Sequence, residues 1–273
     1  MEPRETAVDR PIKLLIADAI RIQIERGELA PGASLPTIQE LCEQWNTSTA
    51  SAREALALLR QQGLVSGGRG KPLTVREAPR WQAVRSSERH QAEKDRVLKP
   101  EAERALVGTS EVETGVSIEQ LRFRSEYDVV KASSELAAMV GVRPGAELLR
   151  REHETTDPKA GHRVAWSISY IPVELIKANP AIMDAKNEPW PGGTQHQLYT
   201  VGIEIMTMVD EVTARMPTTA ERQLWGLENG IPLLLTRRIS IDKLDRIVEV
   251  SDAVFPADRT KLEFKTPLKP WED

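Results

Sequence analysis

Apolar residues recur at helical spacing in the first quarter of the chain. Residues 11–27 predict a helix that Pro11 can open and Gly27 ends, with an apolar face that includes Ile12, Ile16 and Ile20. Thr37 and Glu40 have the spacing of a capping box, which predicts a second, short helix. A third helix, capped by Thr47 or Ser48 and closed by Gly63, buries Ala52, Ala55, Leu56 and Leu59.

Two short apolar runs follow the third helix. Leu64–Val65 and Leu73–Val75 flank the glycine-rich stretch 66–72, which predicts a strand, a tight loop and a second strand. Three helices followed by such a hairpin form the plan of a winged helix-turn-helix, and we expect this domain to span residues 8–76.

The pattern changes in the middle of the chain. Residues 86–96 are a dense run of charges with almost no apolar residue, and we interpret residues 77–123 as a polar linker that can be helical in parts.

Strand-like segments dominate the rest of the sequence. Residues 148–156 and 163–171 predict a hairpin, residues 203–216 a long strand, and residues 232–241 and 246–255 two further strands. Helices are expected at 134–140 and 194–200. Hairpins with interposed helices indicate an antiparallel sheet, so the fold class is α+β, with a second domain over residues 124–270.

The composition of the chain limits the classes of protein to which it can belong. The chain has 273 residues, 40% of them hydrophobic, which suits two domains with their own cores. The apolar runs are too short to cross a bilayer, and the charged first ten residues do not resemble a secretory signal, so no membrane partner is expected. Cys42 is the single cysteine, which excludes an intramolecular disulfide and fits a cytoplasmic location.

Positive charge is concentrated locally although the net charge is −4. Residues 45–75 contain four basic side chains, Arg53, Arg60, Arg69 and Lys71, against one acidic residue. Hydroxyl residues 47–49 and 51 lie at the start of the third helix, where backbone N–H groups can meet phosphate. This pattern predicts binding to double-stranded DNA. Taken singly, the hydroxyls are also helix caps, the arginines also suit a solvated face, and the glycine-rich tip suits any hairpin.

Strand alternation groups a second set of polar side chains. Arg151 and His153 share one face, as do Ser167 and Ser169 on the paired strand, and Glu249 and Ser251 on the last strand. A guanidinium suits a carboxylate or phosphate, so we expect a small, polar, anionic ligand. Histidine adds a donor that loses its charge near neutral pH, so ligand binding is expected to weaken as pH rises. His153 and Glu249 could instead be ordinary strand residues.

The first domain resembles the winged helix of the GntR family. The matching pieces are Leu29-Ala-Pro-Gly32, Leu35-Pro36, Glu40-Leu41, Arg53-Glu-Ala-Leu56 and Gly63-Leu-Val65. The resemblance implies DNA contacts at Thr37, Gln39, Ser48, Thr49, Ser51, Arg53 and Lys71. The positive charge of the predicted wing adds Arg69 to this set. Gln39 and Thr49 stand where the family has arginine, which puts the usual operator sequence in doubt because arginine reads guanine well.

The second domain resembles the UTRA domain of the HutC subfamily. Matching pieces include Leu148-Leu-Arg-Arg151, Ser169-Tyr-Ile-Pro172 and Val248-Glu249. The resemblance implies a chorismate-lyase-like fold, a homodimer and an effector pocket in which a pair of arginines holds an anion. Arg151 matches the first arginine, and His153 replaces the second. The expected effector site comprises Arg151, His153, Ser167, Ser169, Tyr170, Glu249 and Ser251. Tyr170 also suits an ordinary core position.

These features favour a ligand-responsive transcription regulator, a repressor by default, that binds a palindromic operator as a homodimer. An effector-independent DNA-binding protein and a lyase-like enzyme are the alternatives. The sequence has no nucleophile elbow, no phosphate loop and no metal-ligand spacing among its four histidines, so no catalytic residue, metal or cofactor is predicted.

Overall fold

The computed structural model describes residues 10–67, 72–77, 83–105, 121–158 and 161–268. The chain divides into two compact units, residues 1–79 with 227–231, and residues 80–226 with 232–273. Each unit has its own elements and is described separately. Within the described ranges, no helix is both long and apolar enough to cross a bilayer.

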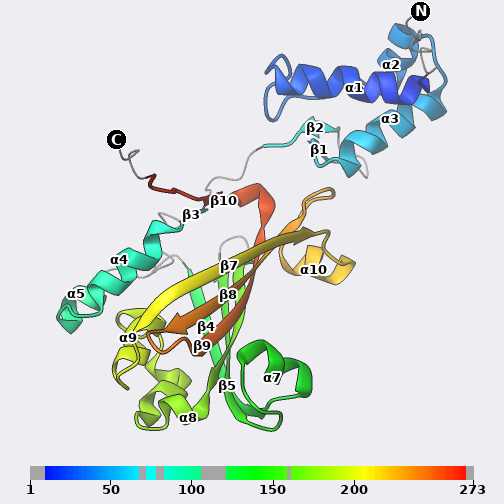
Figure 1. Cartoon of the computed structure of the whole chain (residues 1–273). Helices are drawn as coiled ribbons and strands as arrows, with labels where there is room; N and C mark the ends of the chain where they lie inside the picture. Colours follow the sequence, from blue (N-terminus) through cyan, green and yellow to red (C-terminus); the bar gives the residue numbers. More distant parts are fainter. Residues whose placement is uncertain (1–9, 68–71, 78–82, 106–120, 159–160, 269–273) are drawn as a thin grey trace, which may run out of the picture. The chain divides into compact units, whose positions relative to one another are not determined.

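Three helices and a hairpin form the first unit (Figure 1), and they confirm the predicted order: α1 (Ile12–Glu25), α2 (Ile38–Trp45), α3 (Thr49–Gln61), β1 (Val65–Ser66) and β2 (Thr74–Val75). The capping box is present, because Thr37 accepts a hydrogen bond from the Glu40 N–H and the Glu40 carboxylate accepts one from Thr37 N–H. Ile16, Leu41 and Leu59 are fully buried where the helices meet.

The hairpin is antiparallel, with Val65 opposite Val75. Both valines are buried, so the hairpin extends the helical core. The two predicted strands are therefore confirmed, while the tip residues 68–71, including Arg69 and Lys71, lie outside the described residues.

A six-stranded antiparallel sheet forms the centre of the second unit and confirms the α+β class. Its order across the sheet is β4 (Arg122–Lys131), β5 (Glu147–Asp157), β6 (His162–Pro172), β9 (Ile247–Pro256), β8 (Leu233–Asp242) and β7 (Ile205–Arg215). The predicted hairpin appears as β5 and β6, and the three later strands appear as β7, β8 and β9. Strand β4 was not predicted, because charged residues alternate with few apolar ones along it.

The two faces of the sheet carry different helices (Figure 1). Helix α7 (Ser134–Val140) packs on one face, where Leu148 and Val250 are completely buried. Helices α8 (Val173–Ile176) and α9 (Gly193–Tyr199) cover part of the other face around Leu149. Helix α10 (Thr219–Leu224) and three short 3-10 helices, Pro180–Met183, Ala185–Asn187 and Ala257–Arg259, also belong to this unit.

The segment interpreted as a polar linker that can be helical in parts has regular secondary structure where it is described. It contains β3 (Ala83–Ser86), α4 (Glu88–Arg96) and α5 (Glu101–Ala105), and β3 pairs in parallel with β10 (Thr260–Glu263). Helix α4 is held by polar contacts: Lys94 Nζ donates to Ile205 O at 2.8 Å, and Gln195 Nε2 donates to His90 O at 3.0 Å. Composition did not predict the contacts of α4 with β7 and α9, because these contacts are hydrogen bonds and do not need an apolar helix face.

Candidate functional site

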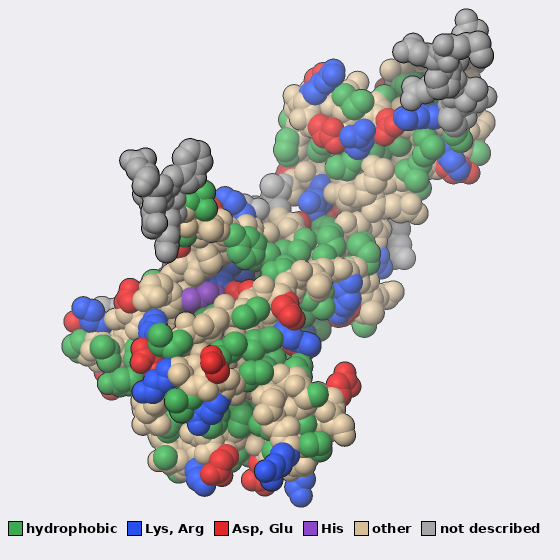
Figure 2. Space-filling model, in the orientation of Figure 1, with side chains coloured by type: hydrophobic (Ala, Val, Ile, Leu, Met, Phe, Trp, Pro, Cys, Tyr) green, Lys and Arg blue, Asp and Glu red, His purple; other side chains and the backbone are tan. Residues whose placement is uncertain are grey.

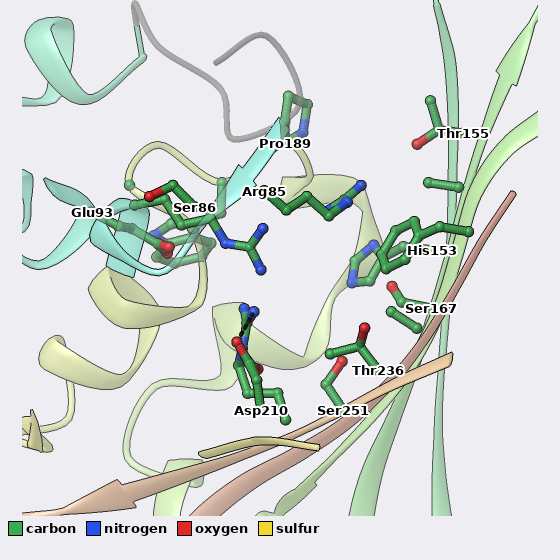
Figure 3. A pocket seen from close by; sticks show the side chains of 18 of the residues that line it. Arg85, Ser86, Glu93, His153, Thr155, Ser167, Pro189, Asp210, Thr236 and Ser251 are labelled. Carbon is green, nitrogen blue, oxygen red and sulfur yellow. Dashed lines mark hydrogen bonds and ion pairs between the residues drawn. The ribbon is translucent and has the colours of Figure 1, made fainter. Parts of the chain in front are cut away.

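A cavity of about 480 Å³ lies within the second unit, on the face of the sheet opposite α7. Strands β5 to β9 form its floor, and β3 and α4 form one wall (Figure 3). Arg85, Ser86 and Glu93 face the labelled floor residues, which are His153, Thr155, Ser167, Thr236 and Ser251. This size suits a small metabolite.

The register of the sheet explains why these side chains meet. Successive strands place one residue each in a transverse row, and every second residue along a strand shares the same face. One row runs across all six strands through Tyr127, Arg151, Ser169, Ser251, Arg238 and Asp210. The next row runs through Ser125, His153, Ser167, Ala253, Thr236 and Val212. The first row is therefore polar on every strand, whereas the second row combines polar residues with Ala253 and Val212.

Arg151 is buried within the first row, with only 2% of its surface exposed. Its Nε donates to Ser169 Oγ at 3.0 Å, and its terminal nitrogens donate to Gln197 at 2.6 Å, to Thr194 at 3.1 Å and to the Glu249 carboxylate. Burial would lower the pKa of Arg151, but Glu249, Tyr127 and Glu188 together outweigh burial and raise it. Arg151 therefore stays charged.

Glu188 and His153 lie beside this buried ion pair. The Glu188 carboxylate accepts hydrogen bonds from Tyr127 Oη at 2.5 Å, Gln197 Nε2 at 3.0 Å and Trp190 N at 2.9 Å. Burial would raise the pKa of Glu188, but the hydrogen bonds from Tyr127 and Trp190 lower it overall. Burial, with the positive charge of Arg151, lowers the pKa of His153. His153 is therefore neutral at pH 7.

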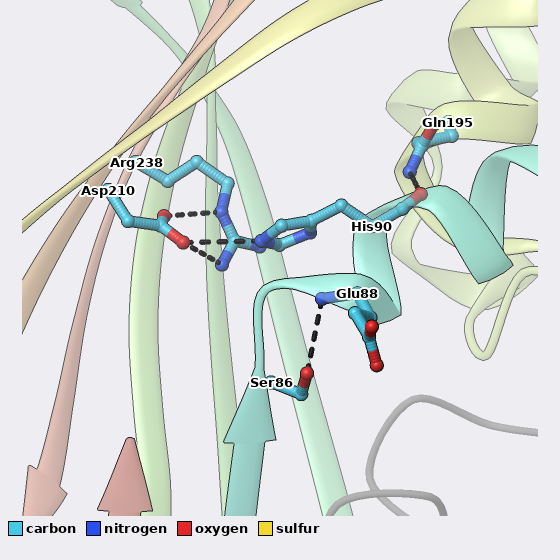
Figure 4. Close-up of polar contacts among 6 residues, drawn as sticks. All are labelled: Ser86, Glu88, His90, Gln195, Asp210 and Arg238. Atoms are coloured by element: carbon cyan, nitrogen blue, oxygen red, sulfur yellow. Dashed lines mark hydrogen bonds and ion pairs between the residues drawn. The ribbon is translucent and has the colours of Figure 1, made fainter. Parts of the chain in front are cut away.

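Asp210 connects the far edge of the floor to α4 (Figure 4). Arg238 Nε donates to Asp210 Oδ1 at 2.8 Å, and His90 Nε2 lies 3.2 Å from Asp210 Oδ2. Burial would raise the pKa of Asp210, but these two partners lower it. Burial lowers the pKa of His90, so the neutral ring holds α4 against β7.

The predicted effector residues divide into three groups. His153, Ser167 and Ser251 line the cavity. Arg151, Ser169 and Glu249 are buried and use their polar atoms on one another. Tyr170 is a correction: it follows Ser169 on β6, so it lies on the opposite face, packed with the cluster around α7.

Sequence reasoning missed the residues that come from other elements. Arg85, Arg89 and Glu93 belong to the segment interpreted as a linker, and Thr236 and Arg238 belong to β8. Alternation along β8 puts Thr236 and Arg238 on one face, but only the register with β9 shows that this face is the cavity floor.

The predicted DNA-contacting residues that are described lie around α2 and α3. Thr37 and Ser48 are N-caps, and Ser48 Oγ accepts a hydrogen bond from Ser51 N at 3.2 Å. Gln39 donates to Glu43 at 3.0 Å, while Thr49 and Arg53 are exposed. The caps show that these hydroxyls have a structural role, whether or not they also meet phosphate.

In the described part of the chain, no group of three His, Cys, Asp or Glu side chains could hold a metal ion. Burial and the positive charge of Arg151 hold the pKa of His153 below the usual value for histidine. A protonated His153 would add positive charge to an anion site only at lower pH.

We expect His153 to titrate below pH 6.5 in NMR spectra of the histidine rings, with its signal assigned from His153→Gln. Because folding favours the neutral ring, the contribution of His153 to stability is complete above pH 6.5 and is lost as pH falls through the lowered pKa. A midpoint at or above 6.5 would contradict the burial of this ring.

Two family patterns match the chain. The family described as "Bacterial regulatory proteins, gntR family" matches residues 13–75, and the family described as "UTRA domain" matches residues 125–261. These two ranges correspond to the winged helix and to the unit that contains the cavity.

Similar proteins cover nearly the whole chain. An HTH-type transcriptional regulator of Rhizobium meliloti is 27% identical over 92% of this chain and 93% of its own length. The HTH-type transcriptional repressor NagR of Bacillus subtilis is 24% identical over 91% of this chain and 92% of its own. A crystal structure of a GntR-family transcriptional regulator matches with a TM-score of 0.69 at 25% identity, over 96% of this chain and 99% of that one. The chain therefore belongs to the GntR family of bacterial transcription regulators, with a C-terminal UTRA domain in the HutC-type arrangement.

Proposed function

We propose that this protein is a cytoplasmic transcription repressor that binds a palindromic operator as a homodimer and releases it when a small, polar, anionic metabolite binds. The observation that carries the proposal is the cavity of about 480 Å³, lined by several arginines, in the same chain as a winged helix. Relatives named as repressors, NagR among them, support the direction of regulation.

The DNA contacts in this proposal come from the start of α3 and from the wing. Ser48 and Thr49 lie at the N-terminus of α3, where unpaired helical N–H groups favour phosphate, and Arg53 is exposed one turn later. Thr37, Gln39 and Ser51 lie close to them in sequence. Arg69 and Lys71 of the wing complete the proposed surface.

We expect Arg53→Ala to weaken binding to duplexes selected by the protein from a random pool by about 1–3 kcal/mol. The parent's affinity should fall steeply with salt, because phosphate contacts release counterions. Fluorescence anisotropy would measure both effects. Arg26→Ala, which removes an exposed arginine after α1, is the control and should bind like the parent. Salt-independent binding, or an unchanged Arg53→Ala variant, would argue against this surface.

The exposed edge of β7 supports a homodimer. Strand β7 has 11 residues at the edge of the sheet, and hydrophobic side chains reach the surface along it (Figure 2). Met206 and Val209 are 58% and 39% exposed, and Met216, directly after the strand, is 57% exposed. The opposite edge, β4, carries charged residues at alternate positions, which discourage strand pairing. A second copy that pairs along β7 would cover the apolar edge.

We expect the parent to be a dimer by light scattering and Val209→Lys to shift the protein toward monomer, because lysine on an edge strand disfavours pairing. Val129→Lys on β4 is the matched control, since Val129 is 52% exposed. A monomeric parent would contradict the homodimer, whereas a dimeric Val209→Lys variant would contradict only the choice of edge.

Effector-dependent release is the central test of the function. A panel of small polar anions is titrated into the operator-bound protein, and at least one should lower operator affinity. By linkage, the operator should lower affinity for that anion by the same factor. Ser167→Ala, which removes a hydroxyl from the cavity, should raise the half-maximal concentration about 2- to 10-fold, and Ser134→Ala on α7 should not. An operator affinity that no compound changes would favour an effector-independent DNA-binding protein.

A further inference from the structure

The polarity of the cavity floor changes along the strands. The row through Arg151 is polar on every strand, and the row through Thr236 is mixed. A third row follows two residues further along each strand, on the same face of the sheet. Its members are Phe123, Thr155 and Ala165 on three adjacent strands, and Phe255, Leu234 and Ala214 on the other three. Thr155 is the one polar residue of this row, so the floor becomes apolar toward it.

The cavity extends over this apolar part of the floor. The apolar residues that line it from the second and third rows and from β10 are Phe123, Ala165, Val212, Ala253, Phe255 and Leu262. In Figure 3, Thr155 marks this end of the cavity, and Asp210 marks the other. The cavity therefore has one apolar end and one polar end.

Two aromatic rings differ in how much of their surface is covered at the apolar end. Phe255 is 6% exposed, and the Arg85 guanidinium stacks on its ring, with the guanidinium carbon 3.6 Å from the ring centroid. Phe123 is 43% exposed. Removing apolar surface from water is favourable, and a second ring packed against Phe123 would add the preference of aromatic pairs for each other. This end of the cavity thus favours an aromatic group.

Thr236 lies where the polar and apolar parts of the floor meet. Its neighbours across the strands are Val212 and Ala253, and its hydroxyl is buried without a hydrogen-bond partner among the described residues. Such a hydroxyl costs free energy unless a ligand satisfies it. Because Thr236 lines the cavity, a ligand can reach it.

We propose that the effector is an anion that also carries an aromatic ring. The ring lies at the apolar end, against Phe123 and Ala165, and a polar atom of the ligand accepts a hydrogen bond from Thr236. The assignment rests on the proposed function, since it names the class of effector for the same cavity. It disfavours a ligand with hydroxyls over its whole surface, because some of them would lie against Phe123 and Phe255 without partners.

The first experiment compares ligands that share a carboxylate and differ in the ring. Calorimetry measures binding of phenylacetate, indole-3-acetate, acetate and glucose 6-phosphate to the full-length protein. At least one arylacetate should bind about tenfold or more tightly than acetate, with a negative heat-capacity change, because its ring leaves water. Absence of arylacetate binding, or equal or tighter binding of acetate or glucose 6-phosphate, overturns the proposal.

The second experiment locates the ring. Phe123→Ala should weaken arylacetate binding about 5- to 20-fold, because it removes the exposed aromatic surface at the apolar end. Tyr199→Ala is the matched control: Tyr199 is 48% exposed on α9, is not among the residues that line the cavity, and should bind like the parent when replaced. Undiminished binding by Phe123→Ala, or an equal loss in both variants, counts against this position for the ring.

The third experiment uses two buried hydroxyls on the same face of β8. Like Thr236, Ser240 is buried with no hydrogen-bond partner among the described residues, but Ser240 does not line the cavity. Thr236→Val and Ser240→Ala should each leave the melting temperature of the unliganded protein unchanged or higher, because each removes an unsatisfied group. Only Thr236→Val should weaken arylacetate binding, about three- to tenfold. Unchanged affinity in Thr236→Val would remove Thr236 from the binding site.

The outcomes separate this proposal from the proposed function. If arylacetates bind with this dependence on Phe123 and Thr236 while no anion changes operator affinity, the aromatic site stands and the proposed regulation fails. If only anions without a ring release the operator, the regulation stands and the aromatic site fails.

Discussion

A guanidinium buried in a sheet requires both a counter-charge and acceptors for its N–H groups, and Arg151 imposes this requirement on the whole second unit. Its partners lie on β6, β9 and α9, so one side chain on β5 ties four elements together. Leaving either member of the Arg151–Glu249 pair alone would be costly. The strand register and the position of α9 are therefore coupled, and the floor of the cavity is fixed before any ligand binds.

The other polar groups around the cavity are connected to this floor by hydrogen bonds. Tyr127 and Gln197 both hold Glu188, and Gln197 also accepts from Arg151, so the loop before α9 is connected to the same network. At the other end of the row, Asp210 connects Arg238 to His90 on α4. The segment that follows the wing hairpin in sequence thus becomes a wall of the cavity. A ligand in this cavity would meet residues of that segment directly.

In the DNA-binding unit, two hydroxyl residues have two roles assigned to them. Ser48 and Thr37 cap their helices with the same hydroxyls that the family resemblance assigns to DNA. The two roles are compatible, because a capped helix N-terminus keeps its favourable dipole toward phosphate. Residues 45–75 contain four basic side chains against one acidic residue, so a chain with a net charge of −4 can still present a basic surface to duplex DNA.

The sequence by itself determined the winged helix, the helix caps, the main hairpin of the sheet and the shared faces of Arg151 with His153 and of Ser167 with Ser169. These features depend on local periodicity and on short-range hydrogen bonds, which residue spacing records directly. Only the tertiary structure decided that Arg151 is enclosed by partners, that Tyr170 faces α7, and that Arg85 and Glu93 line the cavity. Those outcomes depend on strand order and on polar docking between distant segments, and a charge-rich segment such as 86–96 has the same composition whether it is solvated or docked.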